Sequence, residues 1–141
     1  MISTRGRYAI RVLLDLAEHR SGAYIPMKDV AQRQEISLKY LEKILPTLTR
    51  EKLIEGVAGK GGGYRLCRAP EDCRIGEILR ITEGDLAPVS CLTCGAEPCA
   101  RAPYCKTLPM WQKYYQLTLD YFNGITLADL LQNETQMDYV I

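Results

Sequence analysis

Four cysteines lie close together in the second half of this 141-residue chain, at Cys91, Cys94, Cys99 and Cys105. They follow the spacing C-x2-C-x4-C-x5-C in a segment that also contains glycine and proline. Thiolates gathered in this way bind zinc or an iron–sulfur cluster, or they form disulfides. Zinc sites usually use two C-x2-C pairs across a longer gap, whereas only the first two cysteines form such a pair here. The residues leave open a cluster, a zinc site, and a thiol switch in which one cysteine oxidises and another resolves it.

The rest of the chain argues against disulfides. The N-terminus runs directly into an amphipathic pattern without the apolar core of a signal peptide, and no apolar run approaches the roughly 20 residues that cross a bilayer. We therefore expect a cytoplasmic protein with reduced thiols and no membrane partner. The remaining cysteines, Cys67 and Cys73, stand apart and are expected to be small buried side chains. With one histidine and no visible nucleophile–base pair, we expect neither an enzyme nor a small-molecule substrate.

Charge is distributed unevenly, although the net charge is only +1. Residues 1–70 hold 13 Lys and Arg against 7 Asp and Glu, a net charge of +6. Residues 71–141 hold 5 against 10, a net charge of −5. A basic half joined to an acidic half indicates that one end of the chain meets a polyanion.

The hydrophobic pattern predicts a mainly α-helical chain with one small β-hairpin. The first helix is expected to start with Thr4 as its N-cap, and the third with Ser37. Helices are predicted over residues 4–20, 27–34, 38–48, 75–83, from 105 or 109 to 122, and over 127–131. Two β-prone runs, 54–58 and 64–67, flank a glycine-rich tip. A helix-turn-helix followed by a hairpin is a winged helix-turn-helix, in which the third helix enters the major groove and the hairpin reaches the backbone or the minor groove.

The predicted DNA-binding residues come from the second helix, the turn, the third helix and the hairpin of this head. They are Lys28, Ser37, Lys39, Tyr40, Glu42, Lys43, Lys60, Gly61, Gly62 and Arg65. A carboxylate such as Glu42 is unusual beside a polyanion, but it can accept a hydrogen bond from cytosine N4. A surface pair between Glu42 and a neighbouring lysine is the alternative.

Four motifs in register carry a resemblance to a known family. They are Gly6-Arg7-Tyr8-Ala9, Ile36-Ser37-Leu38-Lys39-Tyr40-Leu41-Glu42, Gly61-Gly62-Gly63-Tyr64 and Ile125-Thr126-Leu127-Ala128-Asp129-Leu130. Nearly the whole chain resembles the IscR/NsrR/CymR family (Rrf2 family) of dimeric transcription regulators, and is most similar to its iron–sulfur branch. The resemblance implies a homodimer joined by the long helix that contains Trp111, a palindromic double-stranded DNA operator, and a cluster in the loop before that helix. Glu42 matches a residue tied to sequence selection in that branch.

The resemblance also bears on the ligands of the cluster. The family's cluster branches use three clustered cysteines and a fourth ligand from elsewhere. Leu108 stands where the IscR-like branch has a histidine, and Arg7 where the NsrR-like branch has an acidic residue, and neither can bind iron. We therefore expect an all-cysteine site made of the four loop cysteines of one subunit. Two intervening residues allow Cys91 and Cys94 to reach one centre. Either a 2Fe–2S or a 4Fe–4S cluster is compatible.

These expectations divide the chain into four parts. Residues 1–84 form the DNA-binding head, 85–105 the cluster loop, 106–132 the dimerisation helix and a short last helix, and 133–141 a flexible tail. The expected dimer contacts are Trp111, Tyr115, Thr118 and Phe122, which recur at helical spacing. Iron, oxygen, nitric oxide or redox state is the expected signal, and it would act by reordering the loop. A zinc-containing or thiol-switch regulator is the alternative, and an iron–sulfur electron carrier is a more remote one.

Overall fold

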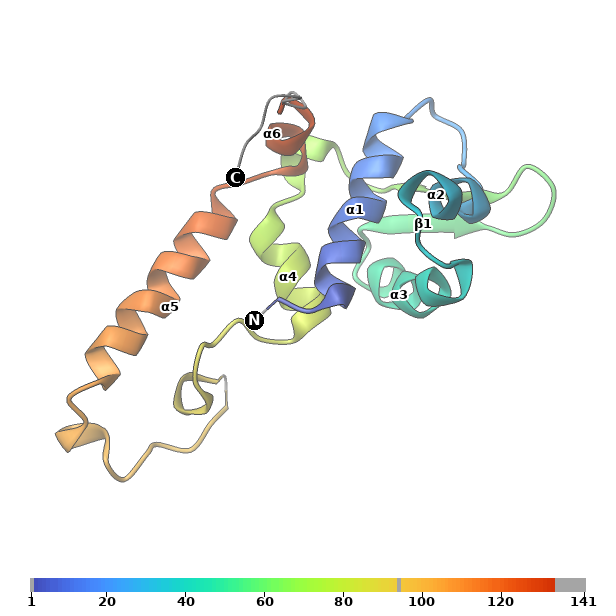
Figure 1. Ribbon diagram of the computed structural model, residues 1–141. Coiled ribbons are helices and arrows are strands. Elements are labelled where there is room, and N and C mark those ends of the chain that lie inside the picture. The colour runs from blue at the N-terminus through green and yellow to red at the C-terminus, as the bar shows by residue number, and fades with distance from the viewer. Residues whose placement is uncertain (1, 94, 134–141) are drawn as a thin grey trace.

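A computed structural model describes residues 2–93 and 95–133, so Cys94 and nearly all of the predicted tail lie outside the described residues. Five helices and a hairpin build the head, and one long helix lies at the edge of the molecule, in contact with the head (Figure 1). The elements in chain order are α1 Thr4–Glu18, α2 Met27–Gln34, α3 Leu38–Arg50, β1 Ile54–Val57, β2 Gly63–Leu66, α4 Ile75–Glu83, α5 Leu108–Asn123 and α6 Leu127–Leu131. Short 3-10 turns occur at Pro70–Asp72, Ser90–Leu92 and Ala102–Tyr104. The architecture is the predicted mainly helical one with a small hairpin.

Local capping explains where two of the helices begin. The side chain of Ser37 accepts a hydrogen bond from the backbone N–H of Tyr40 at 3.1 Å, as predicted for the start of α3. The prediction of Thr4 as the cap of α1 was wrong, because Thr4 is already helical. Ser3 has the extended backbone that a cap requires, and its hydroxyl accepts from the N–H of Gly6.

The hairpin is joined to the chain between α1 and α2. β1 and β2 pair antiparallel with Ile54 opposite Leu66 and Glu55 opposite Arg65. Ile25 adds one further bridge, because it and Tyr64 exchange backbone hydrogen bonds of 2.8 and 2.9 Å. Ile25 therefore ties the two-stranded wing to the connection between α1 and α2, while the wing tip projects beyond the head (Figure 1).

The core of the head receives side chains from α1, α2, α3, α4 and α6. Leu13, Leu41, Ile78 and Leu127 are all fully buried in it. The last short helix returns to the head, where the N–H of Leu127 donates to the carbonyl of Cys73 at 2.9 Å. Of the two separate cysteines, Cys73 is buried as predicted, but the same prediction for Cys67 was wrong, because Cys67 lies exposed just after β2.

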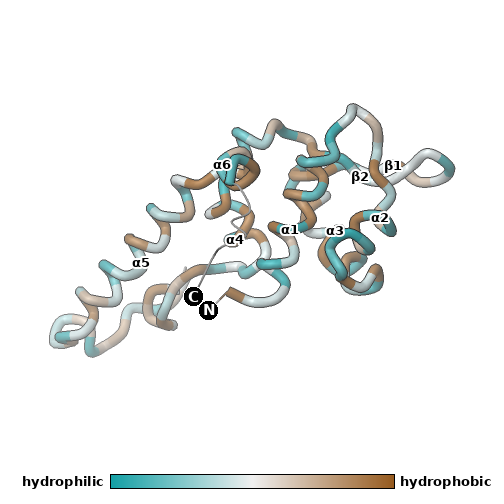
Figure 2. Tube along the Cα trace, turned by 45° about the horizontal axis from the view of Figure 1, so that its top comes forward, coloured by the Kyte–Doolittle hydropathy of each residue, from teal (hydrophilic) through white to brown (hydrophobic). Residues whose placement is uncertain are grey.

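Helix α5 buries none of its residues. It lies on the far side of α4 from the winged part of the head and is reached through the long loop that contains the cysteine cluster (Figure 1). Hydrophobic residues nevertheless recur along it (Figure 2). No helix among the described residues is long and apolar enough to cross a membrane.

Candidate nucleic-acid interface and cysteine loop

Helix α3 is held by one face and exposes the other. Its apolar side chains Leu41, Ile44, Leu45 and Leu48 are buried in the head. The opposite face exposes Lys39, Glu42 and Lys43. Ser37 is exposed at the helix start, and the half-buried ring of Tyr40 packs edge-on against Tyr8, with 5.4 Å between ring centroids. The structure thus presents the predicted residues of the third helix at one surface.

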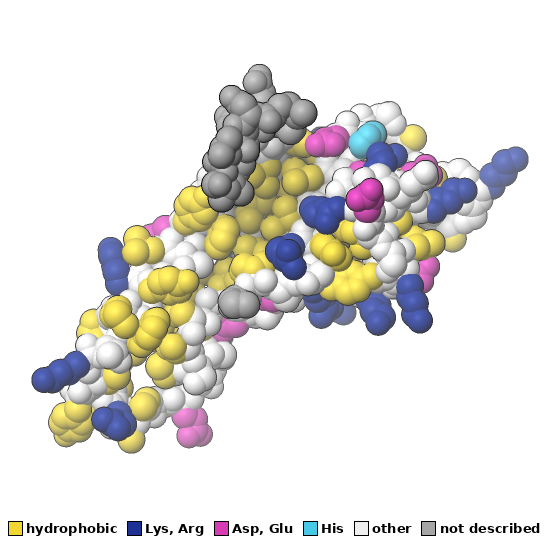
Figure 3. Space-filling view, viewed as in Figure 1, with side chains coloured by type: hydrophobic (Ala, Val, Ile, Leu, Met, Phe, Trp, Pro, Cys, Tyr) yellow, Lys and Arg dark blue, Asp and Glu magenta, His cyan; other side chains and the backbone are white. Residues whose placement is uncertain are grey.

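Lys28 on α2 and Lys60 at the wing tip are both exposed. Figure 3 shows Lys and Arg side chains gathered over α2, α3 and the wing, whereas hydrophobic side chains spread along the opposite part of the same face, with a few Lys and Arg side chains among them. This arrangement places the positive charge of the N-terminal half where a winged head would meet phosphates.

Glycine is required at the wing tip for steric reasons. A Cβ on Gly62 would lie 2.1 Å from the carbonyl oxygen of Val57, well inside van der Waals contact. Gly59 and Gly61 have φ of 90° and 76°, a region that other residues rarely adopt. The tip can therefore be narrow, which lets its backbone approach another molecule closely.

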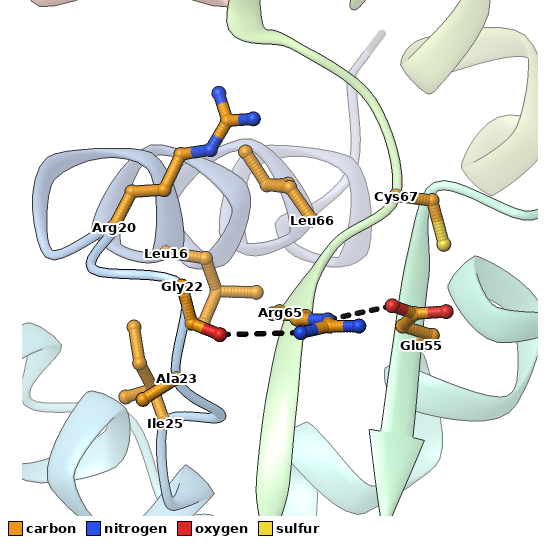
Figure 4. A pocket seen from close by; sticks show the side chains of 9 residues that line it. All are labelled: Leu16, Arg20, Gly22, Ala23, Ile25, Glu55, Arg65, Leu66 and Cys67. Carbon is orange, nitrogen blue, oxygen red and sulfur yellow. Dashed lines mark hydrogen bonds and ion pairs between the residues drawn. The ribbon is translucent and has the colours of Figure 1, made fainter.

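Arg65 lies at the base of the wing and is held by three groups, of which Figure 4 shows Glu55 and Gly22. Its Nε donates to Glu55 Oε1 at 2.6 Å, and a second nitrogen donates to the carbonyl of Gly22 at 3.2 Å. The guanidinium also lies 4.4 Å from the centre of the Tyr24 ring. A pocket of about 290 Å³ opens beside these residues. Arg65 thus ties the wing to the α1–α2 connection and has its charge already paired.

The loop cysteines that the structure describes lie on the surface between α4 and α5. Cys91 and Cys99 are exposed, Cys105 is half-buried, and all three thiols are free. The Sγ of Cys105 lies 3.4 Å from Thr107 Oγ1. This hydrogen bond, with backbone N–H groups of Thr107 and Leu108, lowers the pKa of the Cys105 thiol. By contrast, burial raises the pKa of Cys73, and local desolvation together with the nearby Glu55 carboxylate raises the pKa of Cys67, although that residue is exposed as a whole.

In residues 2–93 and 95–133, no three His, Cys, Asp or Glu side chains lie together as a metal site. The described residues offer the right type of ligand for a thiolate-bound metal group, because three free thiols lie on one surface loop. A site that includes Cys91, Cys99 and Cys105 requires this loop to change conformation so that those three thiols come together. Metal sites often form together with the folding of the segment that holds them.

Two stripes follow the length of α5. The predicted dimer residues Trp111, Tyr115, Thr118 and Phe122 are half-buried, and the hydroxyl of Tyr115 donates to Asp85 at 3.2 Å. The neighbouring stripe is more exposed: Met110 by 54%, Tyr114 by 56%, Leu117 by 55% and Tyr121 by 66%.

The two stripes line a groove of about 770 Å³ between α5 and the segment after α4. Its walls are formed by Ile2, Asp85, Leu86, Ala87, Pro88, Trp111, Tyr114, Leu117, Thr118, Tyr121 and Phe122. The i, i+4, i+7, i+11 spacing of the exposed stripe is visible in the sequence, but this stripe was not among the predicted dimer contacts.

Comparison with known proteins agrees with this architecture. Residues 2–133 match the Rrf2 family, described as "Iron-dependent Transcriptional regulator". The chain is 33% identical to the HTH-type transcriptional regulator IscR of Erwinia tasmaniensis over 133 residues, covering 94% of this chain and 79% of the relative. It is 38% identical to Protein rrf2 of Nitratidesulfovibrio vulgaris, covering 94% and 87%.

Solved structures are also similar. The T. potens IscR structure superposes with a TM-score of 0.74 at 30% identity, covering 94% of this chain and 86% of that one. The structure of CymR, described as the global cysteine regulator of B. subtilis, superposes with a TM-score of 0.75 at 29% identity, covering 93% and 95%. These matches confirm the predicted fold class.

Proposed function

The chain belongs to the Rrf2 family of transcriptional regulators, and we propose that it binds a palindromic operator as a homodimer under the control of an iron–sulfur cluster on its cysteine loop. Family membership makes it a DNA-binding regulator and not an enzyme, as the sequence predicted. The observation that carries the finer proposal is the position of four cysteines on the loop that connects a winged head to an exposed apolar helix.

The proposed DNA contacts come from α3 and the wing. α3 enters the major groove with Ser37, Lys39, Tyr40 and Lys43 facing the DNA, and Lys28 supports it from α2. Glu42 lies on the exposed face of α3 and reads a cytosine through its carboxylate.

At the wing tip, Lys60, Gly61 and Gly62 approach the phosphate backbone. Arg65 acts there mainly as the clamp of the wing, because Glu55 already pairs with its guanidinium. Its place among the DNA-contacting residues therefore stays a prediction.

The proposed dimer interface is the groove and exposed stripe of α5. Large exposed apolar patches on a soluble protein mark interaction surfaces. A second copy packed on Tyr114, Leu117 and Tyr121 would cover this patch and place two α3 helices on one DNA duplex. A two-fold protein dimer reads a palindrome whose half-sites lie about one helical turn apart.

The proposed cluster ligands are Cys91, Cys94, Cys99 and Cys105. When bound, an iron–sulfur cluster supplies a centre that iron supply, oxygen, nitric oxide or redox change alters. The four thiolates hold the loop in one conformation while they are engaged. Because the loop leads directly into α5, its release shifts the dimer helix and, through it, the spacing of the two α3 helices.

The division into a head of residues 1–84, a cluster loop of 85–105 and a dimerisation segment of 106–132 is part of the same proposal. Within it, α6 has a second role. Leu127 fills the core of the head, so α6 also anchors the far end of α5 to the head.

Protein purified without oxygen tests the cluster. We expect visible absorption together with iron and acid-labile sulfide, and an operator affinity that changes when the cluster is removed. Single Cys→Ala changes at each of the four positions should remove most of the iron, whereas Cys67→Ala and Cys73→Ala should not. A spectrally unchanged cluster in Cys91→Ala or Cys94→Ala would show that only three of the cysteines bind and that another ligand completes the site.

A thiol switch is the second candidate, because Cys91 and Cys99 are exposed free thiols on the same loop. It predicts no bound metal, and a reversible disulfide after mild oxidation that changes DNA affinity. Zinc in place of iron would indicate a third kind of site with the same donors.

A further inference from the structure

Asp15 is a charged side chain sealed inside the head, with 0% of its surface exposed. Its Oδ2 accepts from Arg33 Nε at 3.0 Å and from Gln34 Nε2 at 2.9 Å, and its Oδ1 accepts from a terminal nitrogen of Arg33 at 2.6 Å. His19 lies 3.6 Å away on the same helix. Both carboxylate oxygens therefore accept hydrogen bonds from α2, and α1 is bound to α2 through them.

Stability alone does not account for such a group. Removing the Asp15 carboxylate from water is costly, whereas the side chain of its partner Arg33 stays 34% exposed, and apolar replacements of buried ion pairs are often neutral or stabilising. What a buried carboxylate with directional hydrogen bonds does supply is one defined geometry, because the alternatives leave its charge unpaired. The geometry that Asp15 defines is the relative position of α1 and the last turn of α2.

That last turn leads directly into the DNA-reading helix. Arg33 and Gln34 are the final residues in α2. Glu35 follows in the left-handed conformation, with φ of 55°, and Ser37 then caps α3. Only two residues separate Gln34 from that cap, so a shift of Gln34 moves the start of α3.

A second route joins the same residues to α3. Arg11 on α1 donates to Gln34 Oε1 at 3.2 Å and also to the Gln34 main-chain carbonyl. The Arg11 guanidinium lies 5.2 Å from the centre of the Tyr8 ring, and that ring packs edge-on against Tyr40 in the first turn of α3. Two sets of contacts therefore connect α1 to α3: one passes through the end of α2, and the other passes through the rings of Tyr8 and Tyr40.

We infer that Asp15 is a positioning residue for sequence recognition: with Arg33, Gln34 and Arg11 it sets the angle at which α3 enters the major groove. Asp15 touches no DNA, and the inference rests on the proposed use of α3 as the reading helix. Specific binding depends on this angle, because base-edge hydrogen bonds tolerate little misplacement. Non-specific binding depends on the attraction of phosphates by exposed lysines, so it does not depend on the angle of α3.

Asp15→Asn is the most direct test. It keeps the size of the side chain but puts an NH2 group in place of one acceptor oxygen, so in either orientation a donor faces Arg33 or Gln34. Binding is measured for a duplex that the wild type selects from a random pool and for a random duplex of equal length. We expect Asp15→Asn to bind the selected duplex at least about tenfold more weakly, with affinity for the random duplex unchanged.

Glu77→Gln is the matched control. Glu77 accepts two hydrogen bonds from Arg68, at 2.8 and 2.9 Å, and the change neutralises a carboxylate paired with arginine on α4 instead of α1. It should lower the melting temperature without changing the ratio of selected to random affinity. If Asp15→Asn lowers melting temperature as Glu77→Gln does and leaves that ratio unchanged, Asp15 has only a structural role and the inference is overturned.

Gln34→Ala keeps the test decisive if Asp15→Asn does not fold. It leaves the Asp15–Arg33 pair and the bond from Arg11 to the main-chain carbonyl of residue 34 intact, and it removes the side-chain hydrogen bonds of Gln34 to Asp15 and Arg11. A smaller loss of the ratio is therefore expected, and an unchanged ratio would contradict the inference. A wild type that enriches no sequence from the pool would overturn the proposed operator and this inference with it. If the wild type does enrich a sequence, and the variants have the same ratio of selected to random affinity as the wild type, only the inference about Asp15 is overturned.

Discussion

Lys60→Ala isolates the contribution of the wing tip to DNA binding. Lys60 is exposed at the end of the hairpin, and no hydrogen bond or ion pair joins it to another described residue. Removing it therefore changes the charge presented to DNA and leaves the fold intact. Each phosphate contact contributes about 0.9 to the slope of log affinity against log salt concentration.

The size of the effect follows from two wings in a dimer. Losing one contact per wing makes the slope less steep by about 1.8. When salt rises from 50 to 200 mM, the affinity of the wild type should therefore fall by a factor about 12 times larger than that of the variant. The loss at low salt should be similar for all DNA sequences, because a phosphate contact carries no sequence information.

Fluorescence anisotropy over a salt series measures this slope directly. Arg80→Ala is the control, since Arg80 is an exposed cation on α4, outside both proposed surfaces. Arg65→Ala should change the slope less than Lys60→Ala, because Glu55 already pairs with Arg65. An unchanged slope in Lys60→Ala would refute a wing tip that touches phosphate. A full slope change in Arg65→Ala would show that Arg65 exchanges Glu55 for DNA.

Three further changes test the other surfaces. The double variant Tyr114→Ala, Leu117→Ala should sediment as a monomer and should not bind the operator. Because α5 buries no residue, the melting temperature of the head should stay unchanged. A stable dimer would refute the proposed interface. Glu42→Ala should relax preference at one base position by about 1–3 kcal/mol in a binding selection, and an unaltered sequence preference would favour a surface ion pair. Burial raises the pKa of Asp15, but hydrogen bonds from Arg33 and Gln34 outweigh it and lower the pKa overall, and Arg68 lowers that of Glu77. Both carboxylates therefore stabilise the fold at neutral pH, and urea midpoints should fall as pH drops below about 4, with Asp15→Asn losing part of that dependence.

The sequence determined the elements whose signals are local. Ser37 and Thr126 cap their helices through hydrogen bonds to residues three positions on, and Asp129 completes a capping box that is readable in the chain. The glycine-rich tip between two β-prone runs likewise determined the wing. Such contacts span a few residues, so their pattern survives in a linear reading. The cysteine motif can likewise be recognised in the sequence, because it is defined by residue type and spacing alone.

Tertiary structure decided how residues of one type differ. Cys67 and Cys73 are six positions apart with similar local signals, yet one is exposed and the other buried, because packing of α4 and α6 covers only the second. The sequence predicted Arg65 as a DNA-binding cation, whereas in the fold its guanidinium contacts Glu55 and Tyr24.

The same distinction applies to Asp15 and to α5. Nothing near Asp15 in sequence marks it as buried, since its partners Arg33 and Gln34 come from another helix. On α5, periodicity showed apolar faces but not which one the head leaves uncovered. Burial and pairing depend on segments far apart in the chain, and only their assembly gives each side chain its neighbours.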